Sequence, residues 1–296
     1  MGKDEPAIDG RTGLLGLIGN PVEHTLSPDI HNTLARLCGC NLVYVPFLVE
    51  SGGLGDAVRG AYALHVQGLN ITVPYKQDVI PYLQETESLA AAVGSVNTLV
   101  RTQGGYRGYN TDMSGLFRAM KDDGIALKGK EVILLGAGGV GRAIAFMCAF
   151  QGAGRIWILN RDAEKAKAVA VEVNEKTGRE CCSGAGLSQW RELPEQKYLA
   201  IQATSVGLFP DCGRAVIEDP DFYRKLYAGY DLIYRPAKTK FMSLCEAAGA
   251  CAFNGLKMLV YQGVEAFELW NGLTVGQEQA DHIYRMLSLK MEGSGQ

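Results

Sequence analysis

Residues 132–150 read VILLGAGGVGRAIAFMCAF and carry the clearest fold signal in the chain. A short apolar run is followed by a cluster of glycines and then by an apolar segment of helical length. Glycines at positions 136, 138 and 141 fit the pattern G-x-G-x-x-G, in which they permit a tight turn, close approach of a pyrophosphate and close helix–strand packing. The segment therefore predicts a dinucleotide-binding turn formed by Gly136, Ala137, Gly138, Gly139, Val140 and Gly141. The alternative is a glycine-rich turn that binds no ligand.

The end of the next predicted strand bears on the choice of cofactor. NAD sites usually place an acidic residue there to hold the ribose hydroxyls, but this chain reads Asn160-Arg161-Asp162. The guanidinium of Arg161 can clamp a 2′-phosphate, and Lys165 adds charge one helical turn later. These residues favour NADP, although the carboxylate of Asp162 argues against it and Arg161 could be only a solvated loop charge.

Short apolar runs alternate with helical segments along the whole chain, which is typical of βαβ units with parallel sheets. We expect an α/β fold with two domains, a substrate domain and a Rossmann-like domain. The expected strands are Leu14–Ile18, Leu42–Leu48, Gly68–Thr72, Val132–Leu135, Ile156–Leu159, Leu199–Ile201, Tyr230–Tyr234 and Cys251–Phe253. The expected helices are Pro28–Leu37 with Ser27 as its N-cap, Ser51–Leu64, Ala143–Phe150, Ala163–Glu175, 258–271 and Gln277–Lys290. The segment Cys181–Gln196 is expected to contain loops.

Composition excludes several classes of protein. The 296 residues carry a formal charge of −3, without the basic footprint of a nucleic-acid-binding protein. No apolar run is long enough to span a membrane and the N-terminus is polar, so we expect a cytoplasmic protein. The eight cysteines lack zinc-ligand spacing, so no metal is expected. Cys148 and Cys251 are expected in the core, and Cys181 and Cys182 in a loop.

Four polar stretches occur in the first block of the chain, where strands of a sheet are expected to end. They are Asn20–Pro28, Asn70–Lys76, Gly94–Thr98 and Gly108–Asp112. In open α/β sheets ligands bind at the carboxyl ends of strands. These stretches offer hydroxyls, amides, one ammonium and one carboxylate, a set that suits a small, polyhydroxylated carboxylic acid.

Several motifs in a fixed order extend the argument over nearly the whole chain. They are GNPVEHTLSPDIHN (19–32), NITVPYK (70–76), GSVNT (94–98), GYNTD (108–112), GAGGVGRA (136–143), NR (160–161), ATSVGL (203–208) and GLKMLVYQGVEAF (255–267). With these motifs the chain resembles the shikimate/quinate dehydrogenase family. The resemblance implies reversible, NADPH-dependent reduction of 3-dehydroshikimate to shikimate, a step toward chorismate and the aromatic amino acids.

The resemblance also implies roles for individual residues. Lys76 and Asp112 would form the catalytic pair, since a desolvated lysine can exchange the proton that accompanies hydride transfer while the carboxylate orients it. Whether the carboxylate offsets the effect of desolvation stays open. The implied substrate-binding residues are Thr25, Ser27, Asn70, Thr72, Asn97, Tyr234 and Gln262. Thr204 and Gly255 would join the glycine turn, Asn160, Arg161 and Lys165 in binding the cofactor.

The motifs divide the chain into two expected domains, and two other functions are compatible with them. We expect a substrate domain over residues 1–111 and 257–296 and an NADP domain over residues 112–256, in a monomer or homodimer. One alternative is an NAD-dependent quinate/shikimate dehydrogenase of broader specificity. The other is a non-catalytic ligand sensor on the same fold, against which the presence of both Lys76 and Asp112 argues.

Overall fold

The computed structural model describes residues 8–293, and the chain forms two compact units. Unit 1 comprises Met1–Leu116 and Leu259–Gln296, and unit 2 comprises Phe117–Met258. The chain passes from one unit to the other inside helix α4 (Thr111–Asp122) and returns inside helix α9 (Leu256–Asn271). The polar N-terminal residues 1–7, on which the expectation about the N-terminus partly depends, lie outside the described residues.

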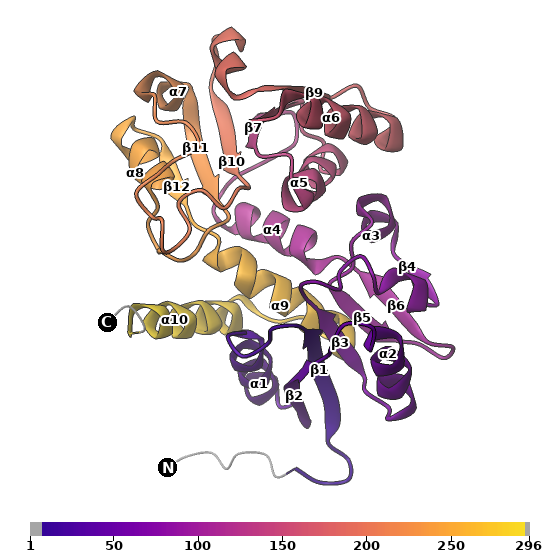
Figure 1. Ribbon diagram of the computed structural model, residues 1–296. Helices are drawn as coiled ribbons and strands as arrows, with labels where there is room; N and C mark the ends of the chain where they lie inside the picture. The colour runs from indigo at the N-terminus through magenta and orange to yellow at the C-terminus, as the bar shows by residue number, and fades with distance from the viewer. Residues whose placement is uncertain (1–7, 294–296) are drawn as a thin grey trace. The chain divides into compact units, whose positions relative to one another are not determined.

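The sheet of unit 1 is mixed, with strand order β2-β1-β3-β5-β6-β4 (Figure 1). Its strands are β1 (Gly13–Gly19), β2 (Leu42–Leu48), β3 (Gly68–Ile71), β4 (Glu85–Thr86), β5 (Thr98–Arg101) and β6 (Tyr106–Tyr109). β1 pairs in parallel with β2 and β3, as expected, but β5 pairs antiparallel with β3 and β6. The expectation of a purely parallel sheet is therefore wrong here, because the short connection between β5 and β6 forms a hairpin.

Unit 1 also contains helices. They are α1 (Ser27–Cys38), α2 (Leu54–Ala63), the 3-10 helix η1 (Ile80–Tyr82), α3 (Ser88–Val93), α10 (Gln277–Gly293) and the unit 1 parts of α4 and α9. Ser27 is the first residue of α1, and the N-cap position falls on Leu26, without a side-chain cap. The prediction that Ser27 caps this helix is wrong, because the helix already includes Ser27, whose hydroxyl oxygen accepts a hydrogen bond from Thr25 Oγ1.

The sheet of unit 2 is entirely parallel, with strand order β12-β11-β10-β7-β8-β9. Its strands are β7 (Glu131–Leu135), β8 (Arg155–Asn160), β9 (Cys182–Gly186), β10 (Tyr198–Gln202), β11 (Leu226–Asp231) and β12 (Cys251–Phe253). This is the doubly wound order, in which the strand order reverses beside the first strand. That switch point lies between β7 and β10, at the carboxyl end of the strand that precedes the glycine cluster.

Helices α5 (Gly139–Phe150) and α6 (Ala163–Thr177) connect the strands on one side of the switch point and lie side by side in Figure 1. The 3-10 helix η2 (Leu187–Glu192) and helices α7 (Pro220–Arg224) and α8 (Lys240–Ala247) complete unit 2. Trp190, Phe222 and Phe241 from these three elements pack against the sheet in one buried cluster. Such burial of large aromatic side chains supplies much of the free energy that holds helices on a sheet.

Three local expectations in unit 2 are wrong. The segment Cys181–Gln196 contains loops, as expected, together with β9 and η2. Cys181 lies in the loop before β9, but Cys182, also expected in a loop, is the first residue of that strand, and both thiols are buried. Cys148 is buried as expected, whereas Cys251 is exposed because β12 is the edge strand of the sheet. The strand expected at Tyr230–Tyr234 runs instead from Leu226 to Asp231, which leaves Tyr234 beyond its carboxyl end.

Within residues 8–293, no helix is both long enough and apolar enough to cross a bilayer. The same residues contain no group of three or more His, Cys, Asp and Glu side chains placed to hold a metal ion.

Candidate active site

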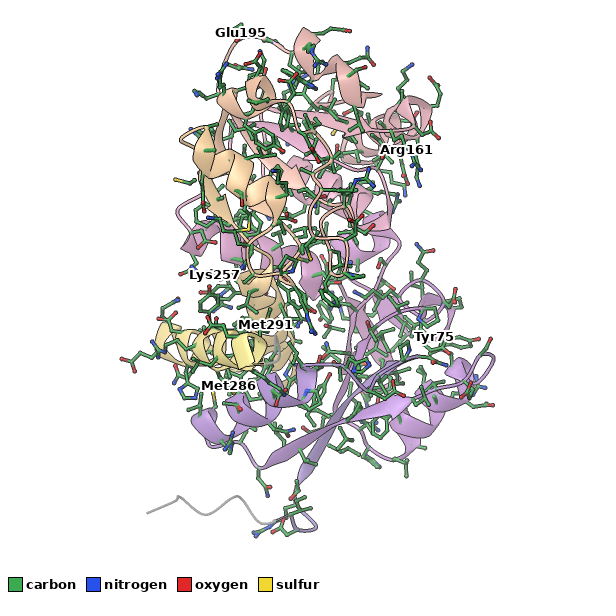
Figure 2. The ribbon with its side chains drawn as sticks, turned by 60° about the vertical axis from the view of Figure 1, so that its left-hand side comes forward. Tyr75, Arg161, Glu195, Lys257, Met286 and Met291 are labelled. Carbon is green, nitrogen blue, oxygen red and sulfur yellow. The ribbon has the colours of Figure 1, made fainter. Side chains whose placement is uncertain are left out.

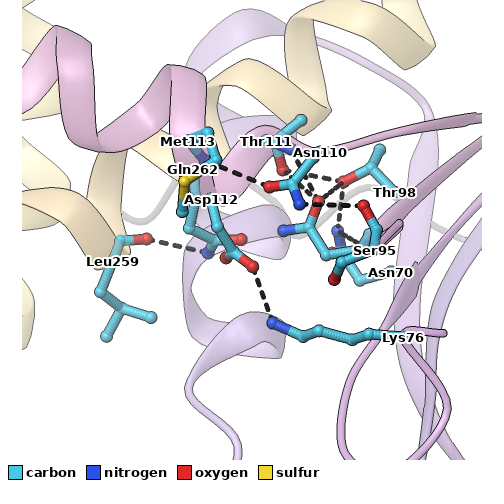
Figure 3. A network of polar contacts seen from close by, with 11 residues as sticks. Asn70, Lys76, Ser95, Thr98, Asn110, Thr111, Asp112, Met113, Leu259 and Gln262 are labelled. Carbon is cyan, nitrogen blue, oxygen red and sulfur yellow. Dashed lines mark hydrogen bonds and ion pairs between the residues drawn. The ribbon is translucent and has the colours of Figure 1, made fainter. Parts of the chain in front are cut away.

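Unit 1 brings together the ammonium of Lys76 and the carboxylate of Asp112 (Figure 3). Lys76 Nζ donates to Asp112 Oδ2 over 2.7 Å. The two side chains are 31% and 21% exposed, so solvent and small molecules reach both. Lys76 follows strand β3, whereas Asp112 stands in the first turn of α4, thirty-six residues later. An ion pair made from two separate segments, partly open to solvent, can orient an ammonium toward a bound ligand.

The start of α4 is fixed by two asparagines. Asn110 Oδ1 accepts a hydrogen bond from the N–H of Met113, as an N-cap residue does, and Asn110 Nδ2 donates to the carbonyl oxygen of Ser95. The N–H of Thr111 donates to Asn97 Oδ1 over 2.7 Å. Asp112 therefore lies in a first helical turn that is held by two side chains, Asn110 just before α4 and Asn97 just before β5.

Asn97 is buried at the centre of this arrangement. Its Oδ1 atom also accepts from the hydroxyls of Thr98 and Thr111. Its amide nitrogen, in contrast, has no hydrogen-bond partner among the described residues. Asn97 thus keeps a free donor beside the helix that carries Asp112, as its predicted contact with a substrate requires.

The predicted substrate residue Asn70 is engaged by the protein on both polar atoms. Its Oδ1 atom accepts from the Tyr44 hydroxyl over 2.7 Å and lies 3.1 Å from His31 Nε2. Its Nδ2 atom donates to the carbonyl oxygen of Asn97 and to Thr98 Oγ1. Sequence reasoning assigned no role to His31 or Tyr44, because they approach Asn70 from α1 and β2 and no local pattern marks that contact. Asn70 therefore braces the Asn97–Thr98 segment.

The remaining predicted substrate residues of unit 1 are half-buried or buried. Thr25 and Ser27 share a hydroxyl–hydroxyl hydrogen bond of 3.1 Å just before α1. Thr72 follows β3, and its N–H donates to the carbonyl oxygen of Ile18. Gln262, on α9, donates from Nε2 to the carbonyl oxygen of Leu259 (Figure 3). Tyr234 belongs to unit 2, where burial raises the pKa of its hydroxyl.

The glycine turn of unit 2 joins β7 to α5 at the switch point of the sheet. Gly136 has φ +111°, a conformation that side chains disfavour, and a Cβ on Gly141 would stand 2.1 Å from the Gly136 carbonyl oxygen. Cβ atoms on Gly138 and Gly139 would meet nothing within 4 Å. Two glycines thus close the turn while two leave open space at the N-terminus of α5, which fits the approach of a pyrophosphate.

The turn after β8 leaves its arginine unengaged. Asn160 Oδ1 accepts from the N–H of Ala137 in the glycine turn, and Asn160 Nδ2 donates to the carbonyl oxygen of Asp162. The Asp162 carboxylate caps α6, accepting from the N–H groups of Glu164 and Lys165. The guanidinium of Arg161 has no partner among the described residues and lies at the surface of unit 2 (Figure 2). The Asp162 carboxylate, whose charge opposes a bound phosphate, is therefore hydrogen-bonded to the first turn of α6.

A buried polar cluster that sequence reasoning missed supports Thr204. The N–H and hydroxyl of Thr204 both donate to Gln202 Oε1, over 2.5 and 2.7 Å. Gln202 Nε2 donates to Asp231, which also accepts from Thr239 Oγ1 over 2.6 Å. Burial raises the pKa of Asp231 to about 6 in spite of these hydrogen bonds. Polar residues at the ends of the apolar strands β10 and β11 were the available signal.

Gly255, the last predicted cofactor residue, is buried, and a Cβ there would stand 2.0 Å from the Leu232 carbonyl oxygen. The glycine therefore permits close packing between the segments that leave β11 and β12. This packing explains the glycine without a ligand, so a cofactor contact at Gly255 stays a prediction.

Comparison with known proteins gives one consistent result. Residues 17–99 match the model of the shikimate dehydrogenase substrate binding domain, 119–190 that of shikimate / quinate 5-dehydrogenase, and 255–279 that of the shikimate 5′-dehydrogenase C-terminal domain. A relative from Methanothermobacter thermautotrophicus, named shikimate dehydrogenase (NADP(+)), is 39% identical over 90% of this chain and 93% of its own length.

Solved structures are similar over almost the whole chain. A shikimate dehydrogenase in complex with NADP+ superposes with a TM-score of 0.85 at 35% identity, covering 97% of this chain and 99% of the other. Shikimate 5-dehydrogenase from Listeria monocytogenes, in complex with shikimate and NAD, gives a TM-score of 0.86 at 32% identity, covering 95% and 98%.

Proposed function

Because the chain belongs to the shikimate dehydrogenase family, we propose that it catalyses the reversible, NADP-dependent interconversion of shikimate and 3-dehydroshikimate. The observation that carries this proposal for the chain itself is the Lys76–Asp112 pair, with Nζ and Oδ2 2.7 Å apart and both side chains accessible. A sensor that only binds a ligand has no need of an accessible proton donor and acceptor in this arrangement.

The reaction requires two transfers at one carbon–oxygen group of the ring. NADP, when bound, exchanges the hydride with the ring carbon. In the direction of reduction, the Lys76 ammonium donates a proton to the oxygen of 3-dehydroshikimate as negative charge develops there. In the direction of oxidation, the neutral amine accepts the hydroxyl proton. Asp112 accepts a hydrogen bond from Nζ and so keeps the ammonium aimed, and it can also accept from a neighbouring ring hydroxyl.

Substrate recognition in this proposal falls to the polar groups around that pair. The hydroxyls of Thr25 and Ser27 hold the substrate carboxylate, and Ser27 stands in the first turn of α1, where an anion is favoured. The free amide nitrogen of Asn97, together with Thr72 and Gln262, binds ring hydroxyls. Asn70 supports Asn97, and the resemblance assigns substrate contacts to Asn70 and Tyr234 as well.

Cofactor binding in this proposal falls to unit 2. The open backbone at Gly138 and Gly139 accepts the pyrophosphate at the N-terminus of α5, with Thr204 beside the turn. Arg161 clamps the 2′-phosphate, and Lys165 adds a second positive charge. Unit 1 is accordingly the substrate domain and unit 2 the NADP domain. We place the enzyme in the cytoplasm, as a monomer or homodimer, in the biosynthesis of aromatic amino acids.

Steady-state rates with shikimate and quinate, each with NADP and NAD, test the proposal. We expect the largest kcat/KM for the pair shikimate and NADP. A preference for quinate with NAD of about tenfold or more, roughly 1.4 kcal/mol in transition-state binding, would instead identify an NAD-dependent quinate/shikimate dehydrogenase of broader specificity. If the protein binds shikimate but shows no turnover with any of the four combinations of substrate and cofactor, it is a sensor.

A further inference from the structure

We propose that Gly115 is a positioning residue for the substrate site, because its missing side chain sets how closely α9 approaches α4 at Gln262. This inference rests on the proposed function. Gly115 lies on α4 three residues after Asp112, and Gln262 lies on α9. The two helices belong to unit 1 at these positions.

The contact between the two helices at this point is made by backbone. A Cβ atom on Gly115 would stand 2.5 Å from the nitrogen of Gln262 and 2.6 Å from its Cα atom. Both distances are far inside van der Waals contact, and main-chain atoms of a helix cannot rotate aside as a flexible side chain can. Any residue other than glycine at position 115 must therefore push the Gln262 backbone away from α4.

The choice of glycine runs against local preference, which indicates that the contact matters. Glycine is unfavourable inside a helix relative to alanine, because it loses more conformational freedom on folding. Residue 115 lies within α4, where alanine would be the better helix former. The close approach to Gln262 is the feature of the described structure that accounts for a glycine here.

The consequence for function follows from the position of Asp112. Residues three apart on a helix share one face, so Asp112 and Gly115 are neighbours on the face of α4. Gln262 is buried beside them, and its Nε2 atom donates to Leu259, one turn earlier on α9 (Figure 3). Displacing Gln262 from α4 moves its amide away from a substrate held by Lys76 and Asp112. A misplacement of about 1 Å at such a site can reduce turnover about a hundredfold.

The test is Gly115→Ala, compared with Gly60→Ala as a matched control. Gly60 is also inside a helix of unit 1, α2, but a Cβ there would meet nothing within 4 Å. We expect Gly115→Ala to lower kcat/KM for shikimate by roughly 10- to 100-fold and to leave the KM for NADP within about twofold. Gly60→Ala should match the wild type in both. Equal kcat/KM for Gly115→Ala and the wild type would overturn the inference.

A double-mutant cycle with Gln262→Ala separates positioning from general damage. If Gly115 acts through Gln262, Gly115→Ala should have little further effect on shikimate kinetics in the Gln262→Ala background. Fully additive effects would contradict this.

Two further arms keep the test decisive. Should Gly115→Ala not fold, Gln262→Asn withdraws the same amide by one carbon–carbon bond and should raise the shikimate KM; an unchanged KM would refute the inference. If the wild type itself does not turn over shikimate, the proposed function fails, whereas an active wild type with an equally active Gly115→Ala variant rejects only the role of Gly115.

Discussion

His31 shows how a residue far from the reacting atoms can support the site. It is fully buried on α1, its ring stacks on that of Tyr44 with centroids 4.3 Å apart, and Nε2 lies 3.1 Å from Asn70 Oδ1. Asn70 in turn donates to the carbonyl oxygen of Asn97. A chain of contacts therefore runs from the buried ring of His31 through Asn70 to Asn97, which fixes the start of α4. Burial lowers the pKa of His31 to about 3.

This lowered pKa predicts a pH dependence of stability. Below pH 6.5 the unfolded chain gains a proton at residue 31 that the folded protein does not bind until about pH 3, so acidification favours unfolding. Between pH 7 and pH 5, the protonation of His31 in the unfolded chain should lower the free energy of unfolding of the wild type by about 2 kcal/mol. His31→Gln should lack this loss, so its free energy of unfolding relative to the wild type should rise by about that amount.

Urea denaturation at pH 7 and pH 5 measures this difference. Comparing two proteins cancels the opposing contribution of Asp231, whose raised pKa makes the folded state gain protons over the unfolded state between about pH 4 and pH 6. His282→Gln, an exposed change on α10, is the control and should show no such trend. A difference between His31→Gln and the wild type that stays constant with pH would refute the prediction.

The sequence indicated which residues carry functional groups better than it indicated which residues those groups contact. The family resemblance paired Lys76 with Asp112, and the two side chains are in contact, with Nζ and Oδ2 2.7 Å apart. The resemblance also assigned Asn70 to the substrate, and that contact stays a prediction. Sequence reasoning did not foresee that the polar atoms of Asn70 also contact residues 26 and 39 positions away and the β5 segment. Contacts at such separations depend on tertiary packing, which local patterns do not encode.

At the scale of elements, the β8–α6 turn shows how backbone geometry settles an ambiguity in sequence. Asn160 ties this turn to the glycine turn, and Asp162 turns its carboxylate onto the first N–H groups of α6. Arg161, between them, stays free to meet an anion. An aspartate before a helix is a common N-cap, so this arrangement was accessible from sequence. Residue types alone, however, left its orientation undecided.

The turn predicts a selective effect on NADP. Arg161→Ala should raise the KM for NADP by roughly 10- to 100-fold, the loss expected for hydrogen bonds between a guanidinium and a phosphate. The KM for NAD should change little, because NAD lacks the 2′-phosphate. Arg224→Ala, an exposed arginine on α7 just before β11 begins, is the matched control and should leave both values unchanged. An unaltered KM for NADP in Arg161→Ala would show that another residue holds the phosphate.

Strand β9 was not predicted, because its residue types disfavour a strand. Strand β9 reads CSGAG, which lacks the branched and aromatic residues typical of strands. A Cβ on Gly184 would stand 2.2 Å from the carbonyl carbon of Ala166, so α6 packs directly on this strand and a larger residue has no room. Tertiary packing, not local preference, makes this segment a strand.

At the scale of the whole molecule, the two units differed in how far sequence predicted them. Unit 2 follows rules for parallel α/β sheets, and its glycine turn fixed the position of the first strand. Unit 1 departs from these rules at β5 and β6, two four-residue strands that pair antiparallel. Their hairpin matters for function because β5 begins next to Asn97 and β6 leads into α4.

In the reaction that we propose, unit 1 holds the alcohol and exchanges its proton, and unit 2 holds the nucleotide. Lys76 is the residue on which this division depends, since its ammonium is the group of unit 1 that we assign to proton transfer. The N–H of Val96 donates to the Lys76 carbonyl oxygen, which fixes the backbone of the segment that carries this side chain.

The most direct test is the kcat of Lys76→Met with shikimate and NADP, measured with Lys167→Met on α6 as the control for loss of an accessible, ion-paired lysine. We predict that kcat falls by roughly 10²- to 10⁴-fold while the KM for shikimate changes by less than about threefold, with the control unchanged. A kcat for Lys76→Met within about tenfold of the wild type would contradict the account, because the proton would then have another carrier.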